Sequence, residues 1–238
     1  MGANGYSRFS LIGFFRNIND TNLTWEGDNN VLLQQGTKFL IDNYKKILLG
    51  KEIEFKVLVN LKESLYFMKK EINGKTKLRI DSPKSLYDLN ILRDLFEFRV
   101  NSLLGRSFEK IMRNEKQLNN LDNFNNAQVF YFQKATLAYG ELYIFNQFVL
   151  RIIDLEDNET KGLLKNICVL FSLNNLEKDL DILRDRDFIG SETCYLIKEE
   201  IMNLCELLKD QLIPIIDVIA PRDEILGAPL GYSDGKVK

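Results

Sequence analysis

The residues best suited to chemistry lie in one short polar stretch, in which Glu26 stands between Trp25 and Gly27. A glutamate can act as a general base, and a following glycine lets the backbone approach a bound ligand closely. Asp28 and Asn29 can each cap a helix, whose free N–H groups would then face the loop and favour an anion. On these residues alone, a solvated surface carboxylate before an ordinary helix cap remains the alternative.

Other nucleophilic and metal chemistry finds little support in the sequence. The chain of 238 residues contains no histidine, which excludes Ser-His and Cys-His pairs and the usual zinc sites. Cys168, Cys194 and Cys205 show neither paired nor metal-ligand spacing, and they predict buried thiols in a reducing compartment. We therefore expect carboxylates to serve as bases, and we expect no metal site.

The composition favours an all-α helical bundle. Hydrophobic residues make up 45% of the chain, and four prolines and fourteen glycines are few breakers for this length. The net charge is −2 with interspersed signs, so no basic surface for nucleic acid is indicated. No charge-free apolar run approaches the ~18 residues of a membrane span.

Apolar residues recur at helical spacing along most of the chain, so helices must position the polar stretch. Gly50 suits the C-cap of the first helix, and Ser82 with Pro83 suits the start of the second. Asp122 would cap the third, which is apolar on two sides and so predicted to be buried in a bundle or an interface, and Pro214 would kink or end the last. The predicted helices span residues 30–49, 82–111, 122–154, 159–173, 176–184 and 191–219.

Three segments resemble the acyl-CoA oxidases of peroxisomal fatty-acid oxidation. Residues 24–31, Thr-Trp-Glu-Gly-Asp-Asn-Asn-Val, are similar to the family's Thr-Tyr-Glu-Gly-Asp-Asn-Thr-Val. Residues 1–7, Met-Gly-Ala-Asn-Gly-Tyr-Ser, resemble its Gly-Gly-His-Gly-Tyr-Ser. Residues 221–235 resemble its Pro-Asp-x-x-Leu-x-x-Pro-Leu-Gly-Arg-Tyr-Asp-Gly, although the arginine before Tyr232 is missing here.

The resemblance implies a domain organisation. Residues 1–50 would be the end of the acyl-CoA dehydrogenase-like C-terminal helical domain, residues 51–81 a linker with a short helix at 58–68, and residues 82–238 the acyl-CoA oxidase C-terminal helical domain. Proteins of this family are much longer, with an N-terminal helical domain and a β-domain before this region. We therefore expect the chain to be the C-terminal part of such an enzyme, inactive by itself.

The resemblance also implies the chemistry. Family members are FAD-dependent enzymes that desaturate fatty acyl-CoA to trans-2-enoyl-CoA, reduce molecular oxygen to hydrogen peroxide and act in the peroxisome as homodimers. Glu26 stands at the motif position of the base that takes the α proton, and we expect it in a dry crevice bordered by the segment from Gly2 to Tyr6. Trp25 and Gly27 would contact the substrate. The cofactor would contact Gly2, Ala3, Asp28 and Asn29.

Two further hypotheses remain. One is a helical interaction module that dimerises or pairs with full-length subunits and performs no catalysis. The other is a relative that uses an electron-transfer partner, as the acyl-CoA dehydrogenases do, although the long helical region after residue 82 argues against it. The C-terminal Lys-Val-Lys is not the Ser-Lys-Leu type of peroxisomal signal.

Overall fold

The computed structural model describes residues 2–51, 65–69, 77–115 and 118–236. Within these ranges the chain is helical, and the nearest approach to a sheet is an isolated bridge between Trp25 and Gly27. The all-α prediction is confirmed. Most of the predicted linker and most of its short helix lie outside the described residues; the 3-10 turn η4 (Tyr66–Lys69) is the described part of that helix.

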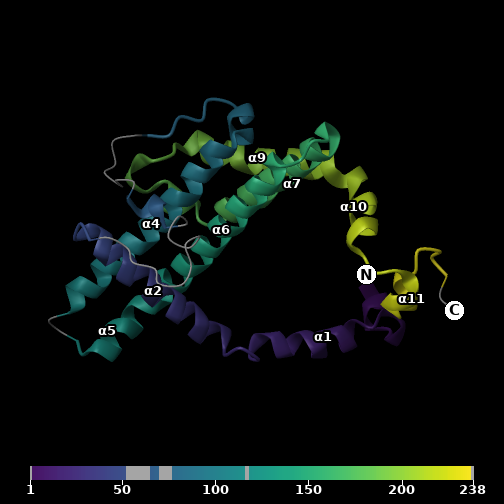
Figure 1. Cartoon of the computed structure of the whole chain (residues 1–238), viewed down its shortest axis with the longest axis horizontal. Helices are drawn as coiled ribbons and strands as arrows, with labels where there is room; N and C mark the ends of the chain where they lie inside the picture. Colours follow the sequence, from purple (N-terminus) through teal and green to yellow (C-terminus); the bar gives the residue numbers. More distant parts are fainter. Residues whose placement is uncertain (1, 52–64, 70–76, 116–117, 237–238) are drawn as a thin grey trace. The chain divides into compact units, whose positions relative to one another are not determined.

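Ten described helices follow one another along the chain (Figure 1). The 3-10 turns η1 (Gly2–Tyr6) and η2 (Arg8–Ser10) precede them, and η9 (Pro229–Gly231) follows them. The helices are α1 (Ile12–Asp20), α2 (Asn29–Leu48), α4 (Leu89–Asn114), α5 (Asn120–Ala127), α6 (Gln133–Ile153), α7 (Asn158–Glu177), α8 (Leu180–Leu183), α9 (Ser191–Leu208), α10 (Leu212–Ile219) and α11 (Asp223–Leu226).

The chain forms two compact units. One contains the residues up to Leu32 together with those from Lys209 onward, and the other runs from Leu33 to Leu208. In the second unit α4 packs on α6, α6 on α7, and α7 on α9. The division cuts α2, and the domain boundaries at residues 50 and 82 stay predictions.

Helix α6 supplies much of the core of the second unit, because one side of it is apolar at helical spacing. The predicted stripe on this side is buried: Ala135, Ala138, Leu142, Phe145, Val149 and Ile152. The second apolar side is more open, since Leu137 and Ile144 are both 52% exposed, and Phe130, in the turn before α6, is 71% exposed. The described residues therefore bury one side of the helix, and burial of the other side in an interface stays a prediction.

A buried arginine connects the packed helices. Arg99 of α4 is 1% exposed and pairs with Glu141 of α6 and, at 3.5 Å, with Asp179. It also donates from Nη1 to the backbone oxygen of Asn175 at 3.0 Å, near the end of α7 where carbonyls lack helical partners. The buried guanidinium of Arg99 therefore links α4, α6 and the end of α7.

Three predicted helix starts are wrong, one of them at residue 176, because α7 continues to Glu177 and α8 begins at Leu180. Helix α4 begins after Asp88, whose carboxylate accepts the N–H of Asn90 at 2.8 Å, because Pro83–Tyr87 form a separate 3-10 turn. Helix α5 begins after Asn119, whose side chain accepts the N–H of Asp122 at 2.9 Å. A five-residue π-helical turn, η6 (Gln128–Phe132), then joins α5 to α6, so the predicted single helix is interrupted.

Candidate functional site

Glu26 lies at the tip of a tight turn. The N–H of Gly27 donates to the carbonyl of Thr24 at 3.0 Å, which places Trp25 and Glu26 at the two central positions. Gly27 has φ +120°, a backbone conformation that favours glycine, so the sequence can make this turn directly before α2. The turn presents the side chains of Trp25 and Glu26 outward, and Trp25 is 74% exposed.

Asp28 caps α2. Its Oδ1 accepts the N–H groups of Asn30 at 2.9 Å and Val31 at 3.3 Å. These are the free donors of the helix start that we expected to face an anion. Because Asp28 occupies them, the expectation of an anion-binding helix end is wrong for these two groups, whereas the capping role predicted for Asp28 is confirmed. Asn29 is the first residue of α2 and is exposed.

The segment from Gly2 to Tyr6 forms the 3-10 turn η1. Gly2 has φ +55°, and no atom lies within 4 Å of the position that a Cβ would occupy. Ala3 is exposed, and the ring of Tyr6 is 94% exposed. The segment thus offers open backbone and a free aromatic face, which suit contact with a flat ring system.

The structure does not bring this segment to Glu26. Helix α1 lies between them, with η1 at one end and the Glu26 turn beyond the other (Figure 1). Its nine residues span roughly 13 Å at 1.5 Å per residue. The expectation that both border one crevice is therefore wrong within one copy of the described chain, because a helix acts as a spacer.

Glu26 itself is exposed. Among the described residues its carboxylate has no hydrogen-bond or ion-pair partner, so it is available to take a proton. The dry crevice that we expected around it is not formed by the described residues. A wall that excludes water would have to come from residues outside them, or from another chain.

The third motif forms a closed turn near the C-terminus. Both carboxylate oxygens of Asp223 accept the N–H of Ser233, at 3.1 and 3.0 Å, and the Ser233 hydroxyl lies 2.7 Å from Oδ2. Sequence reasoning missed this pair. The residues are ten positions apart and follow no local capping pattern, so only the motif resemblance pointed to the region.

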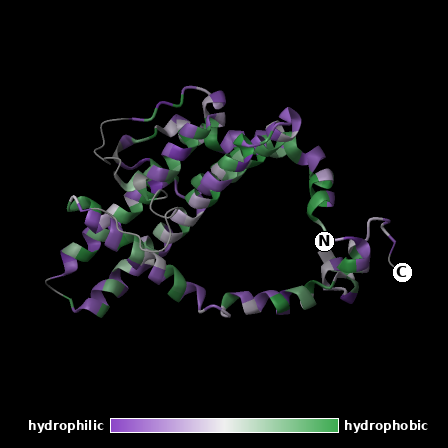
Figure 2. Cartoon of the chain, in the orientation of Figure 1, coloured by the Kyte–Doolittle hydropathy of each residue, from purple (hydrophilic) through white to green (hydrophobic). Residues whose placement is uncertain are grey.

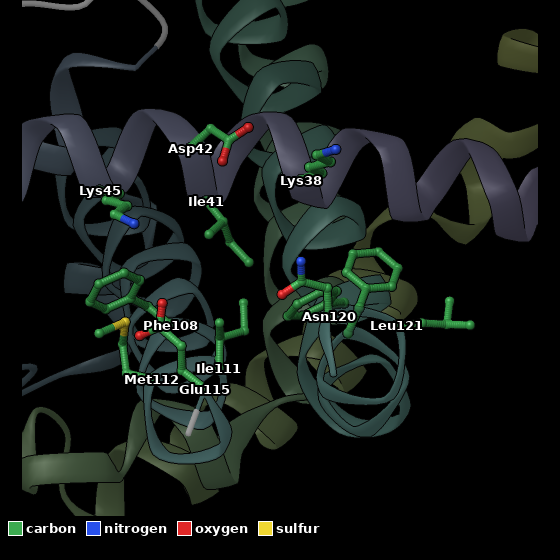
Figure 3. A pocket seen from close by; sticks show the side chains of 12 residues that line it. Lys38, Ile41, Asp42, Lys45, Phe108, Ile111, Met112, Glu115, Asn120 and Leu121 are labelled. Carbon is green, nitrogen blue, oxygen red and sulfur yellow. The ribbon is translucent and has the colours of Figure 1, made fainter. Parts of the chain in front are cut away.

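A separate pocket of about 590 Å³ lies in the second unit, between α2, α4 and α5 (Figure 3). Ile41 points into it from α2, opposite Phe108 and Ile111 of α4. Its rim carries two cationic side chains, Lys38 and Lys45, and two anionic ones, Asp42 and Glu115. The pocket therefore does not favour a ligand of either charge. The remaining lining residues are Met112, Asn120, Leu121, Phe124 and Phe132. None of the predicted site residues lines this pocket.

Two further searches cover the described ranges. In 2–51, 65–69, 77–115 and 118–236, the structure places no three His, Cys, Asp or Glu side chains where they could hold a metal ion. Over the same ranges no helix has both the length and the apolarity to cross a bilayer.

Family profiles match two parts of the chain, which together make up most of its length. The profile described as "Acyl-CoA oxidase" matches residues 88–237, and the one described as "Acyl-CoA oxidase, C-alpha1 domain" matches residues 1–41. Human peroxisomal acyl-coenzyme A oxidase 3 is 26% identical over 245 residues, which cover 99% of this chain and 34% of that protein. Acyl-coenzyme A oxidase 1 of Yarrowia lipolytica is 28% identical over 238 residues, which cover 99% of this chain and 33% of that protein.

Solved structures agree in fold. Acyl-CoA oxidase 1 of Arabidopsis thaliana superposes with a TM-score of 0.87 at 19% identity, covering 99% of this chain and 34% of that one. Acyl-CoA oxidase-2 of Caenorhabditis elegans, solved with FAD, ascaroside-CoA and ATP, gives 0.84 at 21% identity, covering 99% and 33%. The chain spans about a third of the length of the relatives that it matches.

Proposed function

The chain belongs to the acyl-CoA oxidase family, and from this premise we propose that it forms the C-terminal third of an acyl-CoA oxidase. The reaction is the α,β-desaturation of a fatty acyl-CoA to trans-2-enoyl-CoA, the first step of fatty-acid β-oxidation. Molecular oxygen is reduced to hydrogen peroxide. The observation that carries the proposal is Glu26, an unpartnered carboxylate at the motif position of the base, held at a turn tip by Gly27.

In the proposed mechanism Glu26 takes a proton from the α carbon of the thioester. The electron pair of that C–H bond forms the double bond as a hydride leaves the β carbon. FAD, held by Gly2 and Ala3, would supply the hydride acceptor and the route by which two electrons reach oxygen. Trp25, exposed beside Glu26, would wall the acyl chain, and Gly27 would let the thioester approach the backbone. Glu26 becomes an effective base once the rest of the site excludes water from it.

Some of the residues predicted to contact the cofactor are suited to binding FAD. Gly2 and Ala3 present an open backbone beside the free ring of Tyr6, which suits the flavin ring. Asp28 fits less well as a phosphate partner, because its own carboxylate takes the N–H groups at the start of α2. In this proposal Gly2, Ala3 and the exposed Asn29 would contact FAD, and Asp28 would support the turn that carries Glu26.

Since Gly2 and Glu26 stand at opposite ends of α1, one flavin would contact them from two copies of the chain. A homodimer is accordingly part of the proposal. Relatives named as peroxisomal proteins support the peroxisome as its location.

The test is Glu26→Gln in the complete flavin-containing enzyme, with Asp20→Asn as the matched control. Asp20 is an exposed carboxylate at the end of α1. We expect turnover of acyl-CoA to fall by at least ~100-fold, the usual contribution of a general base, with flavin absorbance retained. Turnover within twofold of the wild type, or an equal loss in Asp20→Asn, would remove Glu26 from this role.

A helical interaction module is the second candidate, and a specific observation favours it. Helix α10 is strongly apolar (Figure 2), yet Ile213, Val218 and Ile219 are 72%, 85% and 77% exposed. Such a surface is typical of an interaction site. If Glu26→Gln leaves turnover unchanged while Ile213→Asp abolishes association with full-length subunits in sedimentation, this second function replaces the first.

A further inference from the structure

The two ends of the chain meet within the first unit. Turn η2 packs against η9, and Cδ1 of Leu11 lies 3.9 Å from the position that a Cβ on Gly227 would occupy (Figure 1). Among the described residues of this unit, Ser10 and Ala228 alone are buried, at 6% and 4% exposure. One comes from each end of the chain, so this unit has its interior at the seam between them.

The C-terminal side of the seam is a turn that Asp223 closes. Its carboxylate holds both the N–H and the hydroxyl of Ser233, so the two ends of the segment 223–233 are joined. Within the segment, a Cβ on Gly231 would lie 2.8 Å from Cδ2 of Leu226, which means that Leu226 packs directly on the glycine backbone. These contacts fix η9, and with it the buried Ala228, in place.

The N-terminal side of the seam is strained. Leu11 has φ +52°, which a bulky side chain adopts at a cost and keeps only where its surroundings hold it. The packing of η2, which Leu11 directly follows, against η9 is such a restraint. The Ser10 hydroxyl lies 2.8 Å from the carbonyl of Ser7 and 3.1 Å from that of Gly5, so the conformation at the seam extends into η1.

We propose that Asp223 is a positioning residue for the N-terminal segment. By closing the turn 223–233 it holds η9 against η2, and through η2 it fixes the conformation of residues 2–10. The inference rests on the proposed function in one respect: there, Gly2 and Ala3 contact the flavin, so the C-terminal turn acts on the cofactor side of the site without touching the cofactor.

The test is millisecond hydrogen exchange of the whole chain, read by mass spectrometry. The amides of Ser7, Ser10 and Leu11 donate to backbone carbonyls in the segment and report on it directly. In Asp223→Ala we expect exchange in residues 2–10 to rise about tenfold, since hydrogen bonds to a charged group are lost. Exchange in α4, α6 and α9 should stay unchanged, which shows that the second unit remains folded.

Three variants sharpen the result. Glu224→Ala is the matched control, because this neighbouring carboxylate is exposed and has no partner among the residues that the structure describes. Ser233→Ala removes one of the three contacts, and Asp223→Asn keeps one acceptor oxygen. Both should therefore give smaller rises than Asp223→Ala.

Two outcomes overturn the proposal. In one, Asp223→Ala speeds exchange in residues 223–233 but leaves residues 2–10 at the wild-type rate. In the other, Glu224→Ala produces the same rise as Asp223→Ala. The readout needs neither flavin nor turnover, so its failure is distinct from a failure of Glu26 as the base.

Discussion

The hydroxyl oxygens of Thr37 and Thr136 lie 2.5 Å apart where α2 crosses α6. Both also lie within hydrogen-bonding distance of the carbonyl oxygen of Leu33, at 2.9 and 3.0 Å, and Thr37 Oγ1 lies 2.6 Å from that of Phe132 in the π-helical turn. A Cβ on Gly36 would stand 2.8 Å from Cγ2 of Thr136. The two helices therefore approach so closely that position 36 has room for glycine alone.

Gly36→Ala should destabilise the chain, because the hydrogen bonds of Thr136 oppose the movement that its methyl group would need. We expect the free energy of unfolding to fall by about 1–3 kcal/mol, as for other overpacked sites. Thr136→Ser removes the methyl group and keeps the hydroxyl. In urea denaturation, the double variant should lose less stability than the sum of the single ones. Additive losses would show that the contact does not limit position 36.

Leu142 and Leu137 lie on opposite sides of α6 and allow a matched comparison. Leu142 is 1% exposed and Leu137 is 52% exposed. Leu142→Ala should lower the free energy of unfolding by about 2–5 kcal/mol through lost burial and a residual cavity. Leu137→Ala should cost less than about 1 kcal/mol. Equal losses in urea denaturation would mean that the exposed side of α6 is covered in solution, and analytical ultracentrifugation would then reveal the association.

The three cysteines should differ in reactivity. Burial raises the pKa of the Cys168 thiol to about 11, whereas Cys205 is exposed. The thiolate is the reactive form, so at pH 8 a thiol reagent such as 5,5′-dithiobis(2-nitrobenzoic acid) should modify Cys205 rapidly and leave Cys168 unmodified until the chain is unfolded. Cys205→Ser should remove the fast phase. A fast phase that persists in this variant would contradict the burial of Cys168 and the partial burial of Cys194.

Asp157 should make stability depend on pH. It caps α7 by accepting the N–H of Thr160 at 2.7 Å, and hydrogen bonds from Thr160 lower the pKa of the Asp157 carboxyl below its ordinary value. A lowered pKa in the folded state adds stability above the unfolded pKa, and this stability is lost as the pH falls through the folded value.

The stability gap between wild type and Asp157→Ala should therefore be constant above about pH 5 and shrink below about pH 4 in urea titrations. Glu156→Ala is the control, since Glu156 is an exposed neighbour that makes no capping hydrogen bond among the described residues. A gap that grows on acidification would contradict the sign of the shift.

Local signals were enough to predict α2 to within one residue at each end. Asp28 caps its start, and Gly50 at φ +66° ends it, with the N–H of Lys51 bonded to the carbonyl of Lys46. The break before Pro214 was also predictable. The helix stops at Leu208 and resumes at Leu212, because proline has no N–H to donate and clashes with the turn before it.

The sequence did not predict features that depend on competing helix caps or on contacts between residues far apart in the chain. Ser82 and Pro83 do start a helical turn, but Asp88 is the stronger cap and α4 begins there. The π-helical turn has no sequence signature. At the site, the sequence predicted the capping Asp28, whereas the positive φ of Gly27 came from the structure. The sequence did not predict the exposure of Glu26, which depends on what surrounds the turn. Nor did it predict the packing of η2 against η9, which are more than two hundred residues apart.

The seam between η2 and η9 also sets an order of events during synthesis. Residues 2–11 leave the ribosome before the turn from Asp223 to Ser233 that supports them, which lies more than two hundred residues further along the chain. The segment 2–11 must therefore wait, with Ser10 not yet buried, until residues 223–233 have been made. A chain whose translation stops before Asp223 would present this segment to chaperones and proteases even after its central helices had folded.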